Sequence, residues 1–251
     1  MNENQHILWG RVFGALLFVV LVVALSVAIV RSCKKSDLRK HSNVRVEIVD
    51  GEENYFVTES DVLGILEKKG FLKQDSLIIK DLTKIENVLS KEKSIRKVEC
   101  FFVTNGDVTV RIWQRTPIFR VYGEQNFYVD KDGKIFPLSE HSVAHVPIVT
   151  GSIDSLFVST IFSEMMTFIA SDEFWSAQVQ QIHISENQEL TMIPRLGDHK
   201  IFLGKIVDYP IKLKKMKKFY KNGLTKIGWG DYSIIDVSYA NQVICKRKNN
   251  K

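Results

Sequence analysis

Residues 12–30 form an apolar run of about 19 residues with an arginine directly before and after it. A helix rises about 1.5 Å per residue, so a run of this length spans the hydrocarbon core of a bilayer. A cleaved signal peptide has a shorter apolar region that ends in small residues, whereas this run ends Ala28-Ile29-Val30, and the bulky and charged residues before Cys33 exclude a lipoprotein signal there. We therefore predict a transmembrane helix at residues 12–30, after a short tail at residues 1–11 and before a polar tether at residues 31–43.

The charges around this run leave its orientation open. One positive residue, Arg11, comes shortly before the run, and five follow it closely: Arg31, Lys34, Lys35, Arg39 and Lys40. Counting Lys and Arg alone favours a cytoplasmic C-terminal side, but this rule weakens when a long folded domain follows the helix.

About 210 residues follow the apolar run, enough for one large or two small domains. The hydrophobic content of 45% is typical of a chain with a packed core. Much of the net charge of +6 comes from the tether, residues 212–221 and residues 246–251. Clustered positive charge beside a membrane contacts anionic lipid more often than nucleic acid, so we predict membrane lipid and no nucleic-acid partner. The spacing of Cys33, Cys100 and Cys245 indicates neither a zinc site nor a disulfide framework.

The first part of the chain after the tether reads as a compact α+β unit at residues 44–115. Hydrophobic periodicity and turn residues predict five elements, in this order: a strand at residues 44–48, a helix from Thr58 to Gly70, a helix from Asp81, a strand at residues 97–103 with Val98, Cys100 and Phe102 on one face, and a strand at residues 108–112 with Val108, Val110 and Ile112 on one face. Asn105-Gly106 between the last two strands favours a tight hairpin. We expect two helices that cover a three-stranded sheet.

A second unit of helices and strands follows at residues 116–247, before a basic tail at residues 248–251. Asp132-Gly133 predicts a hairpin turn rather than a calcium loop, because the third acidic position and the distant Glu are missing. The other predicted elements are a helix at residues 155–169 with Ile161, Met165, Phe168 and Ile169 on its core stripe, strands at residues 180–185, 190–193 and 200–203, and a helix at residues 210–220 with Leu213, Met216 and Tyr220 on one face. Its lysines form either a solvated face or an interaction surface.

The sequence contains no recognised catalytic or phosphate-binding motif. His141 and His145 are four residues apart, but Pro147 and the surrounding composition argue against a helix that would align them, and no third ligand is near. There is no glycine-rich phosphate loop and no nucleophile elbow. We therefore expect no enzyme activity, no cofactor, no metal and no small-molecule substrate.

An ordered set of segments resembles the bacterial cell-division family FtsQ, called DivIB in other lineages. The βααββ order after a single anchor is similar to a POTRA domain. The segments that match the family are Arg96–Val121 with the pattern x-x-P-x-x-R/A-V, Phe127–Pro137 with x-V-D-x-x-G-x-x-F, Pro147–Gly151 with P-x-x-T-G, Ile201–Lys205 with x-x-L-G, and Ile235–Tyr239 with the terminal I-D-L-R-Y. Gln114 stands where the family often has Glu, and Ser238 stands where it often has Arg.

This resemblance implies a non-enzymatic scaffold of the division septum. It implies a single-pass protein of the inner membrane with a cytoplasmic N-terminus, a periplasmic POTRA domain and a periplasmic FtsQ-type β domain. The implied partners are the FtsB–FtsL pair and other septal membrane proteins, bound at the terminal strand and the neighbouring basic helix. The residues that correspond to this region are Asp236, Ser238, Tyr239, Asn241, Lys217 and Tyr220. A POTRA-type chaperone or secretion component for outer-membrane substrates is the alternative, although such proteins usually carry several POTRA repeats or a β-barrel, and the sequence indicates neither.

Overall fold

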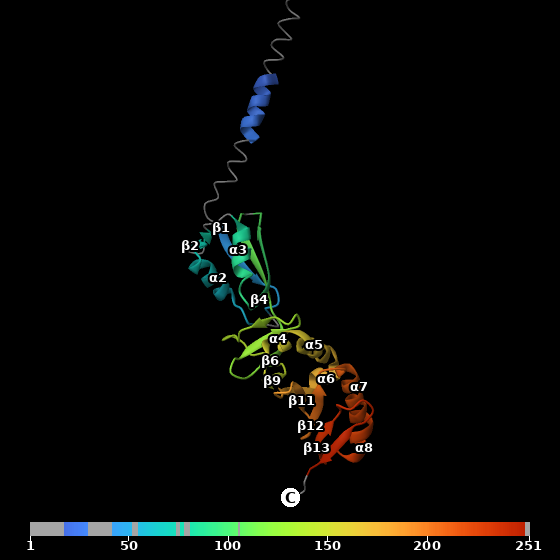
Figure 1. The fold of residues 1–251 in the computed structure, drawn as a ribbon. Coiled ribbons are helices and arrows are strands. Elements are labelled where there is room, and N and C mark those ends of the chain that lie inside the picture. Colours follow the sequence, from blue (N-terminus) through green and yellow to red (C-terminus); the bar gives the residue numbers. More distant parts are fainter. Residues whose placement is uncertain are drawn as a thin grey trace, which may run out of the picture.

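The structure is a computed structural model that describes residues 18–29, 42–51, 55–73, 76–77, 81–104 and 106–248. Within the predicted transmembrane helix, residues 18–29 are helical and their side chains are exposed (Figure 1). The remainder of that predicted helix and most of the predicted tether lie outside the described residues. In the described part of the chain, no helix is both long and apolar enough to cross a membrane.

The N-terminal domain consists of the elements from β1 to β5. Its strands are β1 (Ser42–Ile48), β2 (Leu72–Lys73), β3 (Ser76–Leu77), β4 (Ile95–Phe102) and β5 (Val108–Gln114), and its helices are α2 (Glu59–Lys68) and α3 (Leu82–Leu89). The sheet order is β2-β3-β1-β5-β4, with β1 parallel to β5 and β4 antiparallel to it. The expected three-stranded sheet is thus β1-β5-β4, and the expectation was wrong in leaving out the two-residue strands β2 and β3 that extend it beside β1.

The core of this domain lies between the two helices and one face of the sheet. Four helix residues and three β5 residues are fully buried in it: Val62, Leu66, Ile85, Leu89, Val108, Val110 and Ile112. Thr58 and Asp61 form a capping box that starts α2, and Gly70 (φ 74°) supplies the left-handed residue just after the helix.

Phe102 departs from the predicted core face of β4. Val98 and Cys100 pack against the core as expected, but Phe102 is 53% exposed. The eight residues of α3 rise only about 12 Å, whereas the eight residues of β4 extend for about 27 Å. The helix is therefore too short to cover the whole strand. Beyond Phe102, Gly106 (φ 90°) and a bond from Val103 N to Asp107 O (2.9 Å) close the predicted hairpin, although Asn105 itself lies outside the described residues.

The C-terminal domain consists of the elements from β6 to β14. Its sheet has nine strands in the order β14-β13-β12-β11-β10-β9-β6-β7-β8. The strands are β6 (Pro117–Val121), β7 (Phe127–Asp130), β8 (Ile135–Phe136), β9 (Ile148–Gly151), β10 (Val179–Ile184), β11 (Glu189–Pro194), β12 (Lys200–Lys205), β13 (Tyr232–Asp236) and β14 (Ile244–Arg247). The pairs β6–β9, β9–β10 and β12–β13 are parallel, and the other neighbours are antiparallel.

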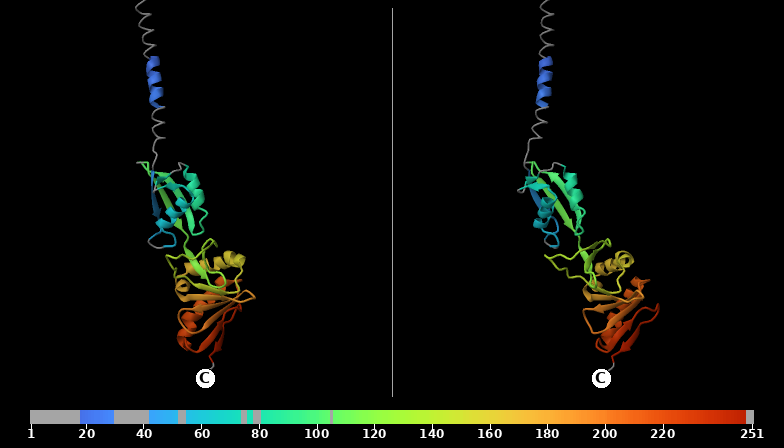
Figure 2. Two further views of the ribbon diagram at one scale, coloured as in Figure 1. Left: turned by 90° about the vertical axis from the view of Figure 1, so that its left-hand side faces the viewer. Right: turned by 60° about the vertical axis from the view of Figure 1, so that its left-hand side comes forward.

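Helical segments cover one face of this sheet (Figure 2). They are α4 (Ser155–Phe157), η1 (Val158–Phe162), α5 (Ser163–Ser171), α6 (Glu173–Gln178), α7 (Tyr209–Phe219), η2 (Tyr220–Leu224) and α8 (Thr225–Ile227). The sequence did not predict α6, which Asp172 caps through bonds from the backbone N–H groups of Phe174 and Trp175. Leu213, Met216 and Tyr220 are buried, as their spacing predicts.

The predicted helix at residues 155–169 contains a break that changes its buried face. Thr160 has non-helical torsion angles (φ −119°, ψ −108°), and the chain continues through η1 into α5. The buried stripe is Val158, Phe162, Met165, Met166 and Ile169. The assignment of Ile161 and Phe168 to the core stripe was wrong, since they are 43% and 37% exposed.

The predicted turn at Asp132-Gly133 is confirmed. The Asp130 carboxylate accepts hydrogen bonds from the backbone N–H groups of Asp132 (2.9 Å) and Lys134 (2.8 Å). Gly133 is left-handed (φ 70°), and a side chain at this position would collide with the carbonyl of Ser159. Asp130 therefore holds the β7–β8 turn with its oxygen atoms.

Candidate partner-binding surface

The end of the nine-stranded sheet differs from the sequence prediction in one respect. The segment Ile235–Tyr239 was expected to be the terminal strand, but β13 ends at Asp236 and Tyr239 lies in the connection to β14. β14 pairs with β13 along one side, and in the described chain it is the outermost strand at this end of the sheet. The edge that a partner would meet is thus β14 rather than β13.

A local turn directs the chain out of the sheet after β13. The Asp236 carboxylate Oδ1 accepts hydrogen bonds from the backbone N–H of Ser238 (2.8 Å) and from its hydroxyl (2.6 Å). This is the arrangement by which Asp side chains favour turns. Gly204 near the end of β12 allows Ser238 to pack closely against the β12 backbone, because a Cβ at residue 204 would lie only 2.9 Å from the Cβ of Ser238. The glycine of the x-x-L-G segment therefore makes room for this turn.

A lysine from α7 holds the connection that carries Tyr239. Lys215 Nζ donates to the backbone carbonyl of Tyr239 and lies 3.5 Å from that of Ala240. Because those contacts use only main-chain oxygens, the Tyr239 side chain stays 51% exposed, and Asn241 is exposed as well. Partial burial lowers the pKa of Lys215, and the nearby Asp236 carboxylate opposes that effect.

The structure does not bring all six predicted residues together. Asp236, Ser238, Tyr239 and Asn241 lie within one short segment. Lys217 is two positions beyond Lys215 on α7, which places it on a different side of that helix.

Lys217 and Tyr220 have partners within the domain. Lys217 forms an ion pair with Asp172 (2.8 Å), and its ammonium lies 5.2 Å from the centre of the Phe174 ring. Tyr220 is only 1% exposed, and its hydroxyl is 2.6 Å from His199 Nε2. Burial raises the pKa of Tyr220 to about 12, so the hydroxyl remains protonated and can donate to this histidine. Tyr220 therefore lies in the core and not at a surface where a partner could touch it.

Three exposed apolar residues just before α7, in α7 and in β14 were missed by the sequence analysis. Val207 is 62% exposed, Ile211 is 63% exposed and Ile244 at the start of β14 is 45% exposed. Ile211 is one turn before Lys215 on the same side of α7, which brings it toward the segment that Lys215 holds. The available signal was that Ile211 is out of phase with the buried stripe of α7, so an apolar side chain there faces outward. Exposed apolar side chains that gather on one surface often mark interaction sites.

This surface is also positively charged. Exposed cations lie on the same elements, β12, α7 and β14: Lys205, Lys214, Lys218, Lys246 and Arg247. The nearby carboxylates are Asp236, which is occupied by its own turn, Asp208 and Asp231, which are exposed, and Glu189, which lies opposite Lys205 on β11. The combination of an outermost strand, exposed apolar side chains and excess positive charge suits a protein segment better than a small molecule.

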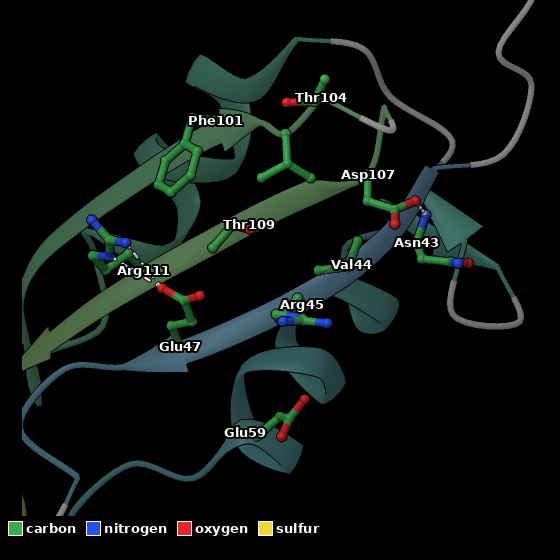
Figure 3. A pocket seen from close by; sticks show the side chains of 11 residues that line it. Asn43, Val44, Arg45, Glu47, Glu59, Phe101, Thr104, Asp107, Thr109 and Arg111 are labelled. Atoms are coloured by element: carbon green, nitrogen blue, oxygen red, sulfur yellow. Dashed lines mark hydrogen bonds and ion pairs between the residues drawn. The ribbon is translucent and has the colours of Figure 1, made fainter.

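A hollow beside β1, β4 and β5 of the N-terminal sheet contains none of the six residues predicted for partner binding (Figure 3). Arg111, which lines this hollow, is paired with Glu47 (3.1 Å) and lies 5.1 Å from the centre of the Phe101 ring. Asp107 accepts a bond from the Asn43 backbone N–H (3.1 Å). These groups satisfy one another, which is typical of a solvated sheet face. Among the described residues, no three His, Cys, Asp or Glu side chains are arranged to hold a metal ion.

Comparison with known proteins gives two family matches that follow the two domains. The model of the POTRA-like domain matches residues 39–113, and the model described as FtsQ/DivIB, C-terminal related, matches residues 116–246. No curated protein matches the chain. The second match covers more than half of the chain and includes all of the candidate surface except Arg247. The chain therefore belongs to the FtsQ/DivIB family, a family of non-enzymatic cell-division proteins.

Proposed function

We propose that this protein is a membrane-anchored scaffold of the division septum that binds the FtsB–FtsL pair through the region around β14. The family match supports a scaffold role in division. The body of the protein lies in the periplasm in this proposal, and the POTRA-like domain assists localisation at the septum.

The observation that carries the proposal is the position of β14 at the end of the sheet. The outer side of an edge strand presents backbone N–H and C=O groups, and an extended segment of another protein can pair with them as one more strand. Tyr239, Asn241 and Ile244 are exposed at one end of this strand. They are placed to give such a segment side-chain contacts, and the surrounding lysines favour acidic residues in it.

The membrane anchor is part of the same proposal. Residues 18–29 form a helix whose exposed side chains are almost all apolar, and the uncharged run in the sequence extends from residue 12 to residue 30. The basic residues of the tether by themselves favour the opposite orientation, but this rule weakens before a long folded domain, and the family match supports a periplasmic body. A reporter that works only outside the cytoplasm, fused after Lys251, should be active, and activity of a cytoplasmic reporter alone would contradict this topology.

The binding test uses Tyr239→Ala in the full-length protein, with Tyr122→Ala as the matched control. Tyr122 is 58% exposed in the same domain but lies after β6, away from β14 in the sheet order. Loss of an aromatic anchor at an interface centre costs about 2 kcal/mol or more, which is roughly a thirtyfold loss of affinity for purified FtsB–FtsL. Both variants should keep the melting temperature of the parent. Unchanged affinity in a folded Tyr239→Ala protein would remove this residue from the site.

A second experiment separates the scaffold role from the role of a POTRA-type chaperone or secretion component. Crosslinking in dividing cells should recover septal membrane proteins with the full-length chain. Recovery of outer-membrane assembly proteins in their place would support the chaperone or secretion role and contradict the scaffold.

A further inference from the structure

We propose that a joint between the two domains locks them into one rigid body, so that the N-terminal end of β1 and the edge strand β14 keep a fixed separation and orientation. This inference goes beyond partner binding and does not depend on which partner binds. Three sets of contacts carry it: an aromatic cluster, a strap and a buried ion pair.

The aromatic cluster fixes the centre of the joint. Phe56 lies between β1 and α2 and is only 6% exposed. The other residues of its buried cluster all belong to the C-terminal domain. The Phe56 ring meets Tyr128 of β7 and Phe136 of β8 edge to face, with ring centres 5.3 Å and 5.9 Å apart. This geometry is favourable for aromatic rings and adds to the gain from burying them. One side chain of the N-terminal domain is thus inserted into the β7–β8 hairpin of the C-terminal domain.

The strap consists of residues 137–147, which connect β8 to β9 and reach the N-terminal domain. The backbone N–H of Ala144 donates to the Tyr128 hydroxyl (3.1 Å), which ties the strap to its own domain. The Ser139 hydroxyl donates to the carbonyl of Phe56 (3.0 Å), and His141 Nε2 is 3.1 Å from Asp61 Oδ2.

Asp61 is part of the capping box of α2, so His141 contacts the start of that helix. Burial acts to raise the pKa of Asp61, but the hydrogen bonds of Thr58 and the contact with His141 outweigh it and lower the pKa below the usual value. The Asp61 carboxylate is therefore charged at neutral pH and available to the strap.

A buried ion pair holds the joint beside the covalent connection. Arg115 Nη1 is 2.6 Å from Asp130 Oδ2, and the two side chains are only 19% and 3% exposed. Arg115 Nε also donates to the carbonyl of Lys93 in the N-terminal domain (2.9 Å). Since Asp130 also organises the β7–β8 turn, this arginine connects both domains to the same hairpin. Breaking one side of a buried ion pair leaves an uncompensated charge, which is strongly unfavourable.

The connection itself leaves little freedom. β5 ends at Gln114 and β6 begins at Pro117, so only residues 115 and 116 join the domains. The proline ring restricts the residue before it to extended conformations. Domains joined by a polar interface usually move relative to one another. Here the short connection, the inserted ring, the strap and the ion pair all oppose rotation, and the domains lie one after the other along the molecule (Figure 2).

The test measures the distance between the domains in the full-length protein. Spin labels at exposed Lys91 and Lys218, placed by cysteine substitution after the native cysteines are replaced, report that distance by pulsed electron paramagnetic resonance. The parent should give a narrow distribution, and Phe56→Ala should broaden it. Tyr55→Ala is the matched control, because Tyr55 is the adjacent residue and is 56% exposed. It should leave the distribution narrow.

Two results would overturn the inference: a broad distribution in the parent, or the same width in Phe56→Ala and Tyr55→Ala. Circular dichroism shows whether Phe56→Ala keeps its secondary structure. If that variant fails to fold, the double variant Ser139→Ala with His141→Ala takes its place, because both side chains act only through the strap. Broadening in the double variant supports the joint, and an unchanged width contradicts it.

Discussion

The substitution Tyr220→Phe tests whether a residue that the sequence assigned to the partner surface has a structural role instead. Tyr220 is 1% exposed and its ring packs against Trp175 and Trp229, with ring centres 6.2 Å and 5.1 Å away. Phenylalanine keeps the ring and removes only the hydroxyl, which is 2.6 Å from His199 Nε2. The change therefore removes the short buried hydrogen bond to His199 and a longer one that Gln178 Nε2 donates to the same hydroxyl (3.5 Å).

The expected loss of unfolding free energy follows from the buried polar group that Tyr220→Phe leaves without a hydrogen-bond partner. His199 is 1% exposed, and its Nδ1 already has no hydrogen-bond partner in the described residues. Without the Tyr220 hydroxyl, Nε2 is also unpaired, and leaving a buried polar group unsatisfied costs about 1–3 kcal/mol of unfolding free energy. For a protein of this size, each kcal/mol lowers the melting temperature by roughly 2–4 °C.

Denaturant unfolding and FtsB–FtsL affinity are to be measured on the same protein preparations. Tyr122→Phe is the control, because Tyr122 is 58% exposed away from the proposed surface and removal of its hydroxyl should change neither stability nor affinity. We expect Tyr220→Phe to lose stability and to keep its affinity per folded molecule. A Tyr220→Phe protein with parental stability and weakened binding would refute the assignment of Tyr220 to the core.

Three further predictions rest on other buried contacts. Burial, followed by repulsion from a nearby lysine, lowers the pKa of His199, so the folded state resists its protonation. Stability should be complete above about pH 6.5 and fall below it by up to about 1.4 kcal/mol per pH unit, and His199→Gln should flatten that slope in denaturation curves from pH 7.5 to pH 5. The backbone N–H of Cys100, on the edge strand β4, donates a hydrogen bond to Glu86 Oε1 (2.7 Å). Glu86→Ala should therefore speed hydrogen exchange of this amide, whereas Glu86→Gln keeps an acceptor and should keep the exchange slow. Equal exchange rates in the two variants would contradict this role of Glu86. Arg115→Met should cost about 1.5–3 kcal/mol in thermal unfolding because it removes a short hydrogen bond to the Asp130 carboxylate, which keeps its bonds from Asp132 and Lys134, and unchanged stability would contradict this role.

Local patterns in the sequence determined most of the elements. The alternation of Val44, Val46 and Ile48 predicted β1, and Thr58 followed by acidic first-turn residues predicted the start of α2. The phase of Leu213 and Met216 identified the buried side of α7. These predictions hold because the signals act within one or two turns, where backbone geometry and solvent exposure depend on near neighbours.

The tertiary structure decided which side chains are accessible and how the domains meet. Tyr220 follows the same helical period as the core residues before it, but only the approach of His199 and Trp229 shows that no partner can reach it.

The joint could not be read from the sequence for the same physical reason. Phe56 lies more than seventy residues before the Tyr128 and Phe136 rings that bury it, and Ser139 is 83 residues from the carbonyl that it binds. Contacts at such separations depend on how the sheets pack, which no local period encodes. The sequence alone therefore determined the elements and the family resemblance. Only the packing of distant segments determined the position of β14 as the free edge of the sheet, the side chains that a partner can reach, and the joint between the two domains.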